Sequence, residues 1–329
     1  MTWTGRRVLV TGAGGFIGSH LVERLVGEGA EVTAFIRYTS RGSIGLLRML
    51  DREFLASVHV LTGDLRDPTA VRKAALGQST IFHLGALIAI PYSYANPTEV
   101  AEVNVMGTLN VLNAALEAEV ERVVHTSTSE TYGTAVAVPM GESHLPQAQS
   151  PYSASKIGAD AIAHSYWRSF ALPVATIRPF NVYGPRQSGR AVIPAIIGQA
   201  LYSNRIALGS LSPTRDFTFV TDTVDAFLRM AEHGGVVGRV VNIGTGREIS
   251  ISDLVGHILE RLDLDIPVVV SDERKRPVSS EVYRLVCDPS LANELLGWRP
   301  AVSLDEGIDR VVDFLRQNPD WTAVDRYEV

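Results

Sequence analysis

Short apolar runs separated by amphipathic segments occupy the first half of the chain. The runs have the length and the Val and Ile content of buried strands, and they cover residues 8–10, 32–36, 58–61, 81–84, 123–126 and 174–177. Between most of them apolar residues recur at helical spacing, most clearly over residues 16–25, 104–118 and 153–170. Strands that alternate with helices predict an α/β protein with a doubly wound parallel sheet.

The pattern becomes irregular after Pro179, where loops rich in Gly, Pro and Arg alternate with short elements. A strand-like run at residues 240–243 precedes a helix expected from about Ser252, a candidate N-cap, to Leu262. We therefore expect a smaller α/β carboxy-terminal domain that packs closely on the first and leaves a cleft between them. The predicted boundaries are 1–180 with about 217–244 for the first domain, and 181–216 with 245–329 for the second.

Composition excludes several classes of protein. The 329 residues carry 30 basic and 36 acidic side chains, a net charge of −6, which offers no basic surface for nucleic acid or for an anionic membrane. Cys287 is the single cysteine, so an intrachain disulfide or a cysteine-rich zinc site is impossible, and we expect no metal. The first strand begins within a few residues of Met1, and the longest apolar stretches, such as 86–90, are far too short to span a membrane. We expect a cytoplasmic protein.

A glycine-rich turn at residues 11–18, TGAGGFIG, joins the first predicted strand to the first predicted helix. Glycines at 12, 15 and 18 let the backbone approach a pyrophosphate at the helix N-terminus, which is the context that distinguishes a dinucleotide-binding turn from an ordinary tight turn. The first domain is therefore predicted to be Rossmann-like and to bind NAD or NADP.

The end of the second strand bears on the choice of cofactor. Ile36 stands where an acidic residue would bind the ribose of NAD, and Arg37 and Arg41 follow, which suits the 2′-phosphate of NADP. NADP is slightly favoured, and NAD stays possible. Asp64 and Leu65, after the third strand, are placed for an adenine contact or for a simple turn.

Tyr152 and Lys156 lie four residues apart, on one face of a predicted helix. A lysine beside a tyrosine favours the phenolate, so the pair predicts a lowered tyrosine pKa and a usable base. The pair alone is common by chance, but it follows the glycine turn by about 140 residues, and the combination indicates an oxidoreductase-type site.

These motifs, together with Pro179–Pro185 (PFNVYGP) and Arg215–Val220 (RDFTFV), resemble the extended short-chain dehydrogenase/reductase family that acts on nucleotide-diphosphate sugars. The resemblance extends from residue 6 to about 315. It implies a carboxy-terminal domain that binds the sugar nucleotide, and a homodimer formed through a four-helix bundle built from the helices near 104–118 and 153–170. The cofactor-binding residues expected are Gly12, Gly15, Phe16, Ile17, Arg37, Arg41, Asp64, Leu65, Leu84, Ala86, Tyr152, Lys156 and Pro179.

The same resemblance implies a set of substrate contacts. Asn181 and Arg215, with Arg276 as a third candidate, match positions that hold the diphosphate, and Glu281 is placed to accept from ribose hydroxyls. The substrate-binding residues expected are Ser93, Asn181, Arg186, Arg190, Val192, Arg215, Arg276 and Glu281. Any one of the charged residues in this set, taken alone, is about as often a solvated surface group as a ligand contact.

Thr128, Ser129 and Glu130, at the end of a buried strand, decide between reactions. An unpaired glutamate there costs free energy unless it caps a local structure or does chemistry. The triplet resembles that of GDP-mannose 4,6-dehydratases, and the chain is more similar still to bacterial enzymes that make 4-keto-6-deoxy-N-acetylhexosamine nucleotides. The resemblance implies that Tyr152 is the base at the 4-hydroxyl, that Thr128 bonds the C4 oxygen and that Glu130 is the base at C5 and the acid for water loss. Ser129 would assist, and Thr131 replaces the usual Val or Leu without affecting these roles.

Three alternatives remain open. UDP-glucuronate decarboxylases resemble the same triplet and need an arginine for the substrate carboxylate, for which Arg186 and Arg190 are candidates. A 4-epimerase would leave Glu130 without a function. A non-catalytic NADP sensor on this fold would have no use for Tyr152, Lys156 and Glu130. The sequence therefore predicts an NAD(P)-dependent nucleotide-sugar 4,6-dehydratase, a lyase, whose nucleotide base and sugar stay undetermined.

Overall fold

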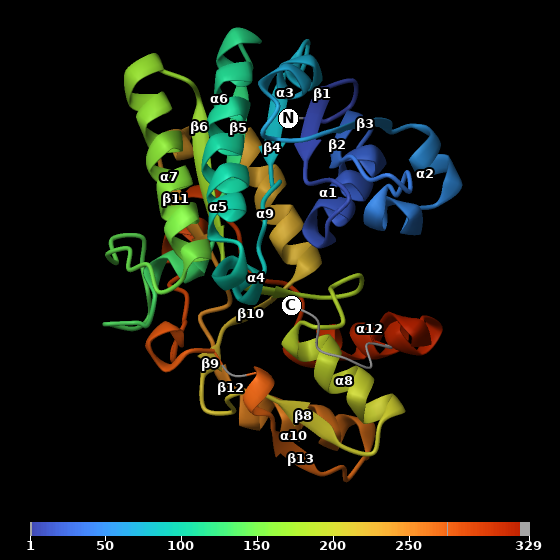
Figure 1. Cartoon of the computed structure of the whole chain (residues 1–329). Coiled ribbons are helices and arrows are strands. Elements are labelled where there is room, and N and C mark those ends of the chain that lie inside the picture. Colours follow the sequence, from blue (N-terminus) through green and yellow to red (C-terminus); the bar gives the residue numbers. More distant parts are fainter. Residues whose placement is uncertain (1, 275, 323–329) are drawn as a thin grey trace.

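A seven-stranded parallel sheet forms the centre of the protein (Figure 1). The computed structural model describes residues 2–274 and 276–322, so Lys275 and the last seven residues of the predicted second domain lie outside it. The strand order is β11-β6-β5-β4-β1-β2-β3, and every neighbouring pair is parallel. The strands are β1 (Arg7–Thr11), β2 (Glu31–Arg37), β3 (His59–Gly63), β4 (Thr80–His83), β5 (Arg122–Thr126), β6 (Val174–Pro179) and β11 (Val240–Ile243).

Helices cover both faces of this sheet. Along β1 the side chains alternate, so that Val8 and Val10 pack in one hydrophobic cluster and Leu9 packs in another on the opposite face. On the first face lie α1 (Phe16–Gly27), α9 (Val220–Glu232) and α11 (Ser290–Leu296), and on the second lie α3 (Pro68–Ala75), α6 (Gly107–Glu117) and α7 (Pro151–Phe170). The doubly wound α/β fold predicted from the sequence is thus confirmed. Among the short helices, α2 (Arg52–Ala56) packs against α1, whereas α4 (Ile90–Ala95) and α5 (Pro97–Ala101) pack against α7.

Two predicted helix boundaries differ in the structure. The helix expected from residue 104 begins at Pro97, because α5 runs through a π-helical turn at Glu102–Met106 into α6. The helix expected to be capped by Ser252 is capped by Ser250, whose hydroxyl accepts from the Asp253 amide at 3.0 Å. In both cases the true start lies upstream, where a proline or a serine fits the first turn better.

A further hydrophobic cluster is formed by elements that Figure 1 draws below the sheet. Its helices are α8 (Val192–Tyr202), α10 (Ile251–Leu262) and α12 (Leu304–Gln317). Its short strands are β7 (Asn181–Tyr183), β8 (Ile206–Leu208), β9 (Thr214–Arg215), β10 (Phe217–Phe219), β12 (Ile249–Ser250) and β13 (Val268–Val270), which form three separate two-stranded sheets. The predicted residue boundaries of the two domains stay a prediction. None of the helices in the described residues is long and apolar enough to cross a membrane.

A charged cluster ties α7 to the ends of β5 and β6. The Asp160 carboxylate accepts from Arg178 Nη2 at 2.8 Å and from Ser127 Oγ at 2.5 Å, and it contacts His125 Nε2 at 3.0 Å. Arg178 also donates to Ser127 Oγ at 3.2 Å, and its guanidinium lies 4.4 Å from the centre of the Tyr132 ring. These contacts fix the polypeptide at the point where β5 leaves the sheet.

Removal of this carboxylate is expected to destabilise the fold. Asp160→Ala leaves the buried Arg178 cation without its counter-ion, and breaking a buried pair in this way costs about 3–5 kcal/mol. The matched control is Asp225→Ala, because Asp225 pairs with Arg229 at 2.7 Å on a half-exposed helical surface, where water is present and such pairs contribute about 0–1 kcal/mol. Denaturant unfolding of both variants measures the difference, and equal losses of unfolding free energy would contradict the structural importance of Asp160.

Candidate active site

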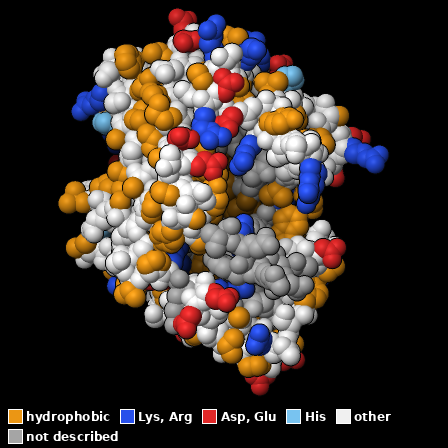
Figure 2. All heavy atoms as spheres, viewed as in Figure 1, with side chains coloured by type: hydrophobic (Ala, Val, Ile, Leu, Met, Phe, Trp, Pro, Cys, Tyr) orange, Lys and Arg blue, Asp and Glu red, His pale blue; other side chains and the backbone are white. Residues whose placement is uncertain are grey.

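Two adjoining cavities open at the carboxyl ends of the sheet strands. The larger, of about 640 Å³, is lined from β1, β2, β5 and β6, and the smaller, of about 360 Å³, is lined mainly from β7, α8 and the loops around β8. Asn181, Val182, Gln187 and Arg276 line both, so they mark the junction. Figure 2 shows a hollow between the sheet-containing part of the molecule and the part below, with charged side chains at its rim. Ligands of open α/β folds bind at this edge of the sheet.

The glycine turn fits a pyrophosphate. Gly12 has a φ of +70°, and a Cβ there would lie 2.8 Å from the Gly85 amide nitrogen. A Cβ on Gly18 would lie 2.2 Å from the Gly12 carbonyl oxygen, so a side chain would push the helix away from the turn. Helix α1 starts after Gly15, with no side chain capping its first turn and no acidic residue in it. Its amides and its dipole therefore suit an anion.

Most of the expected cofactor residues line the larger cavity. These are Gly12, Gly15, Phe16, Ile17, Arg37, Leu84, Ala86, Tyr152 and Pro179. Four others lie outside its lining: Arg41, Lys156, Asp64, which pairs with Arg66 at 2.7 Å, and Leu65, which is buried against Gly107.

The segment after β2 adds lining residues that the sequence reasoning missed, namely Thr39, Ser43, Ile44 and Gly45. Gly45 has a φ of +63°, and a Cβ there would lie 2.5 Å from the Gly14 carbonyl oxygen. This contact packs the segment onto the glycine turn. In the sequence, the closely spaced Gly42 and Gly45 were the one sign that this segment contains turns and could approach another backbone closely.

Tyr152 and Lys156 face the end of β5 from helix α7. Ser150 caps this helix, since its hydroxyl accepts from the Ser153 amide at 3.1 Å, and Pro151 occupies the first turn. Tyr152 is 7% exposed and lines the larger cavity, whereas Lys156 lies beneath it and donates from Nζ to the Thr126 carbonyl oxygen at 2.6 Å. The helix therefore places a phenol at the cavity wall and a buried cation one turn further on.

The electrostatics of this pair differ from the prediction. Burial raises the pKa of Tyr152 above its ordinary value, and a hydrogen bond with the Thr128 side chain opposes that rise only in part. Burial also lowers the pKa of Lys156 to about 8, although the nearby Asp160 carboxylate acts in the opposite direction. The expected lowering of the tyrosine pKa was wrong for this structure, because desolvation outweighs the hydrogen bond with Thr128, and the nearby Glu130 and Asp160 carboxylates also raise the pKa.

The triplet at residues 128–130 forms the start of a 3₁₀ turn, η3 (Ser129–Tyr132), directly after β5. Thr128 caps the turn by accepting from the Glu130 amide at 3.3 Å, so a local cap is present and its side-chain acceptor is Thr128, not Glu130. The Thr131 hydroxyl donates to the Thr128 carbonyl oxygen at 2.7 Å, which gives the unusual Thr131 a structural contact. Ser129 is buried and Glu130 is directed to the cavity wall, where its side chain is 12% exposed.

Glu130 has an arginine partner. Arg276 Nη1 lies 3.4 Å from Glu130 Oε2 and 3.5 Å from Oε1. In the smaller cavity, Arg215 Nη2 lies 3.6 Å from Glu281 Oε1. Two carboxylates and two guanidiniums therefore meet around the junction of the cavities.

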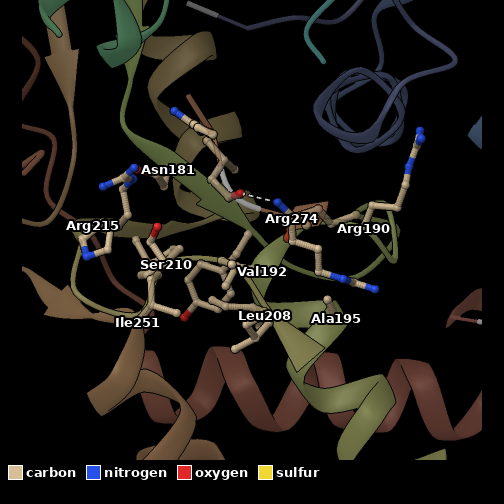
Figure 3. Close-up of a pocket in the computed structure, with 18 of the residues that line it drawn as sticks. Asn181, Arg190, Val192, Ala195, Leu208, Ser210, Arg215, Ile251 and Arg274 are labelled. Carbon is tan, nitrogen blue, oxygen red and sulfur yellow. Dashed lines mark hydrogen bonds between the residues drawn. The ribbon is translucent and has the colours of Figure 1, made fainter. Parts of the chain in front are cut away.

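The smaller cavity contains most of the expected substrate residues. Figure 3 shows Arg215 on one side and Arg190 and Arg274 on the other, with Asn181, Val192, Ser210 and Leu208 between them. Arg274, Leu208 and Ser210 were not predicted, because nothing in the local sequence distinguishes them from surface loop residues.

Two of the expected substrate residues lie elsewhere. Ser93 is fully buried, with its hydroxyl donating to the Ile90 carbonyl oxygen at 2.7 Å inside α4. Arg186 pairs with Glu23 of helix α1 at 2.8 Å. Neither residue lines the cavities, because the bonds that hold them turn both side chains to other parts of the fold.

Comparisons with known proteins agree with this geometry. The model of the family described as GDP-mannose 4,6 dehydratase matches residues 9–311. A UDP-glucose 4-epimerase of Mycolicibacterium smegmatis is 37% identical over 318 residues, which cover 94% of this chain and 98% of that protein. The dTDP-D-glucose 4,6-dehydratase of Homo sapiens is 31% identical over 331 residues, covering 98% of this chain and 93% of that protein.

A solved structure extends the likeness to three dimensions. DesIV, the dTDP-glucose 4,6-dehydratase of Streptomyces venezuelae with NAD and TYD bound, superposes with a TM-score of 0.87 at 31% identity, covering 96% of this chain and 99% of DesIV. The resemblance inferred from the glycine turn, the Tyr152–Lys156 pair and the triplet is thereby confirmed. The chain belongs to the GDP-mannose 4,6 dehydratase family of nucleotide-sugar enzymes, within the extended short-chain dehydrogenases/reductases.

Proposed function

We propose that the protein is an NAD(P)-dependent nucleotide-diphosphate-sugar 4,6-dehydratase that forms a 4-keto-6-deoxy sugar nucleotide. The observation that carries the proposal is the position of the Glu130 carboxylate in the same cavity as Tyr152 and the glycine turn. An enzyme that only oxidises and reduces C4 has no need for a second proton-transfer group there. A dehydratase needs one, because it removes the proton at C5 and expels the hydroxyl at C6.

The two cavities divide the ligands between them. The larger suits the dinucleotide, whose phosphates would meet the N-terminus of α1 and the turn at Gly12. The smaller suits the nucleoside diphosphate, since Arg190, Arg215 and Arg276 line it. The sugar would then lie at the junction, beside Tyr152 and Glu130.

The first chemical step depends on Tyr152. Its phenolic oxygen takes the proton of the sugar 4-hydroxyl, while Thr128 holds the C4 oxygen. The nicotinamide, when bound, supplies the hydride acceptor for C4, the hydride donor for C6 and a positive charge near the phenol. Lys156 stays beneath as a cation bonded to the Thr126 carbonyl oxygen, and its charge favours the phenolate.

The elimination depends on Glu130. Its carboxylate removes the proton at C5, which the new C4 ketone makes acidic, and a C5–C6 double bond forms as the C6–O bond breaks. The same proton passes from Glu130 to the departing hydroxyl, which leaves as water, and Ser129 assists by a hydrogen bond. In the last step C6 receives a hydride and C5 receives a proton, which balances the proton that Tyr152 took from the 4-hydroxyl. The product then differs from the substrate by the loss of one water, and the cofactor would end in its starting oxidation state.

A UDP-glucuronate decarboxylase is the second candidate, and one observation favours it. The reaction needs a cation for the substrate carboxylate, and Arg276 lies beside Glu130. The arginines considered from the sequence are less suitable, because Arg186 pairs with Glu23 and Arg190 lines the smaller cavity. A 4-epimerase is the third candidate, supported by the relative in Mycolicibacterium smegmatis.

The cofactor preference and the assembly also belong to this proposal. Arg37 lines the larger cavity and supports NADP, whereas DesIV has NAD bound. A homodimer is supported by the packing of α6 on α7 and by the half-exposed side chains of Met106 and Phe170 near these helices.

A substrate panel tests the reaction. We expect the cofactor-loaded protein, incubated with UDP-, GDP- and dTDP-hexoses and hexosamines, to release a product lighter by one water. Mass spectrometry reads the loss directly. Carbon dioxide released only from UDP-glucuronate would establish the decarboxylase instead, and a product of unchanged mass with inverted C4 would establish the epimerase.

Substitution of Glu130 should separate the two halves of the reaction. Glu130→Gln retains Tyr152, so substrate still reduces the cofactor, but water loss slows by about 10²–10⁴-fold, the usual contribution of one acid–base group. Tyr152→Phe is the companion variant and is expected to lose cofactor reduction as well. Absorbance of the reduced nicotinamide and the mass of the product give the two readouts. Normal water loss by Glu130→Gln would refute the assigned role.

The pH dependence of the first step should report Lys156. Because burial lowers its pKa to about 8, the side chain is a cation below that pH and loses its proton as the pH rises through it. We expect the rate of cofactor reduction to decline above pH 8. Asp160→Asn removes a carboxylate that raises this pKa and should move the decline to lower pH. His83 and His125 also face Lys156, but burial lowers the pKa of both, so they stay neutral in this range. A decline at the same pH in both proteins would argue against Lys156 as its origin.

A further inference from the structure

Four charged side chains form a compact group at the junction of the cavities. Glu130 pairs with Arg276, and Glu281 pairs with Arg215. Burial lowers the pKa of Arg215, the Glu130 charge acts against this lowering and the Arg276 charge adds to it, so the two pairs lie close enough to influence each other. The group therefore behaves as a single cluster with two positive and two negative members.

Arg276 occupies the central place in this cluster. It lines both cavities, whereas Glu130 lines only the larger and Arg215 and Glu281 line only the smaller. Its side chain is 26% exposed, so it has room to move, while that of Glu130 is 12% exposed and is held on the capped turn η3. If one partner of the pair moves, the geometry indicates that it is Arg276.

A carboxylate and a phosphate compete for the same guanidinium. Both accept two parallel N–H bonds from arginine, and a diphosphate in the smaller cavity would be doubly charged. The diphosphate therefore attracts Arg276 more strongly than one carboxylate does. Both oxygens of the Glu130 carboxylate face Arg276 Nη1, at 3.5 and 3.4 Å, so in this pair the carboxylate is occupied by the guanidinium and is not free to approach a proton on carbon.

We propose that Arg276 is a positioning residue shared between Glu130 and the substrate diphosphate. Binding of the diphosphate draws Arg276 away from Glu130 and so releases the carboxylate to act at C5. This inference rests on the proposed location of the nucleoside diphosphate in the smaller cavity. The exchange would couple the two cavities, because Glu130 would stay paired with Arg276 until the nucleotide end of the substrate is bound.

The exchange has a consequence that is measurable without any sugar chemistry. Because Glu130 competes with the diphosphate for Arg276, the carboxylate weakens nucleoside diphosphate binding in the native protein. Removal of the carboxylate should strengthen it. A variant that impairs catalysis is thus expected to bind the nucleotide fragment more tightly.

A double-mutant cycle tests the exchange. Isothermal titration of the cofactor-loaded protein with UDP, GDP and dTDP identifies the best ligand, and its Kd is then compared in four proteins: native, Glu130→Gln, Arg276→Gln and the double variant. We expect Glu130→Gln to lower Kd by about 3–10-fold, the range for a partly buried ion pair that no longer has to be broken. In the Arg276→Gln background the same change should alter Kd by less than about 2-fold.

General repulsion between Glu130 and the phosphates is the competing explanation, and the cycle distinguishes it. Repulsion alone would give the same improvement in both backgrounds, and that result would overturn the proposal. Glu281→Gln is the matched control, because Glu281 contacts Arg215, so removal of Arg276 should change its effect on Kd much less than it changes the effect of Glu130→Gln. If Arg276→Gln does not fold, Arg276→Met supplies a second uncharged background of similar length.

The remaining outcomes are also decisive. If Glu130→Gln leaves Kd unchanged or raises it, Arg276 is not shared. If none of the three nucleotides binds, the smaller cavity is not a diphosphate site. Failure of the proposed dehydratase reaction is separate, since a decarboxylase or an epimerase acting on the same nucleotides would still give the binding result described.

Discussion

The contact of Asp160 with Arg178 is the interaction on which the geometry of the site depends. It joins helix α7 to strand β6, and the same carboxylate bonds Ser127 and contacts His125 on β5. His125 and Ser127 flank Thr126, whose carbonyl oxygen receives the Lys156 ammonium. One buried carboxylate thus fixes both the carbonyl group that accepts from Lys156 and the point where the chain turns into the triplet at 128–130.

The same carboxylate balances charge in a region with little access to water. Arg178 and Lys156 are buried cations, and burying either one alone would be costly. Asp160 stands one helical turn beyond Lys156, so Tyr152, Lys156 and Asp160 follow each other along one face of α7 at intervals of four residues. The phenol, the cation and its counter-ion are therefore built into a single helix, whose rigidity preserves their order.

Local patterns revealed the parts of the site that lie on one continuous segment. The glycine turn, the Tyr152–Lys156 pair and the strand-end triplet each lie within a single strand-to-helix unit, so their spacing in the sequence reflects their spacing in space. The sheet could also be predicted from local patterns, because each apolar run forms one strand. The sequence was less informative about Arg186 and Ser93, whose partners, Glu23 and the Ile90 carbonyl oxygen, depend on packing. Asp160 was overlooked because its partners are on β5 and β6.

The choice between the possible reactions also depends on residues that are distant in the sequence. Dehydratases and decarboxylases resemble each other in the triplet, so Glu130 alone does not separate them. What differs is the charge that surrounds the carboxylate during the reaction, and here that charge comes from Arg276, 146 residues away in the sequence. Under the proposed exchange, a diphosphate that withdraws Arg276 would leave the Glu130 carboxylate free at C5, which suits elimination, whereas an Arg276 that stays beside Glu130 would suit a substrate with its own carboxylate. On that proposal, the reaction would be decided by how the two cavities share one arginine.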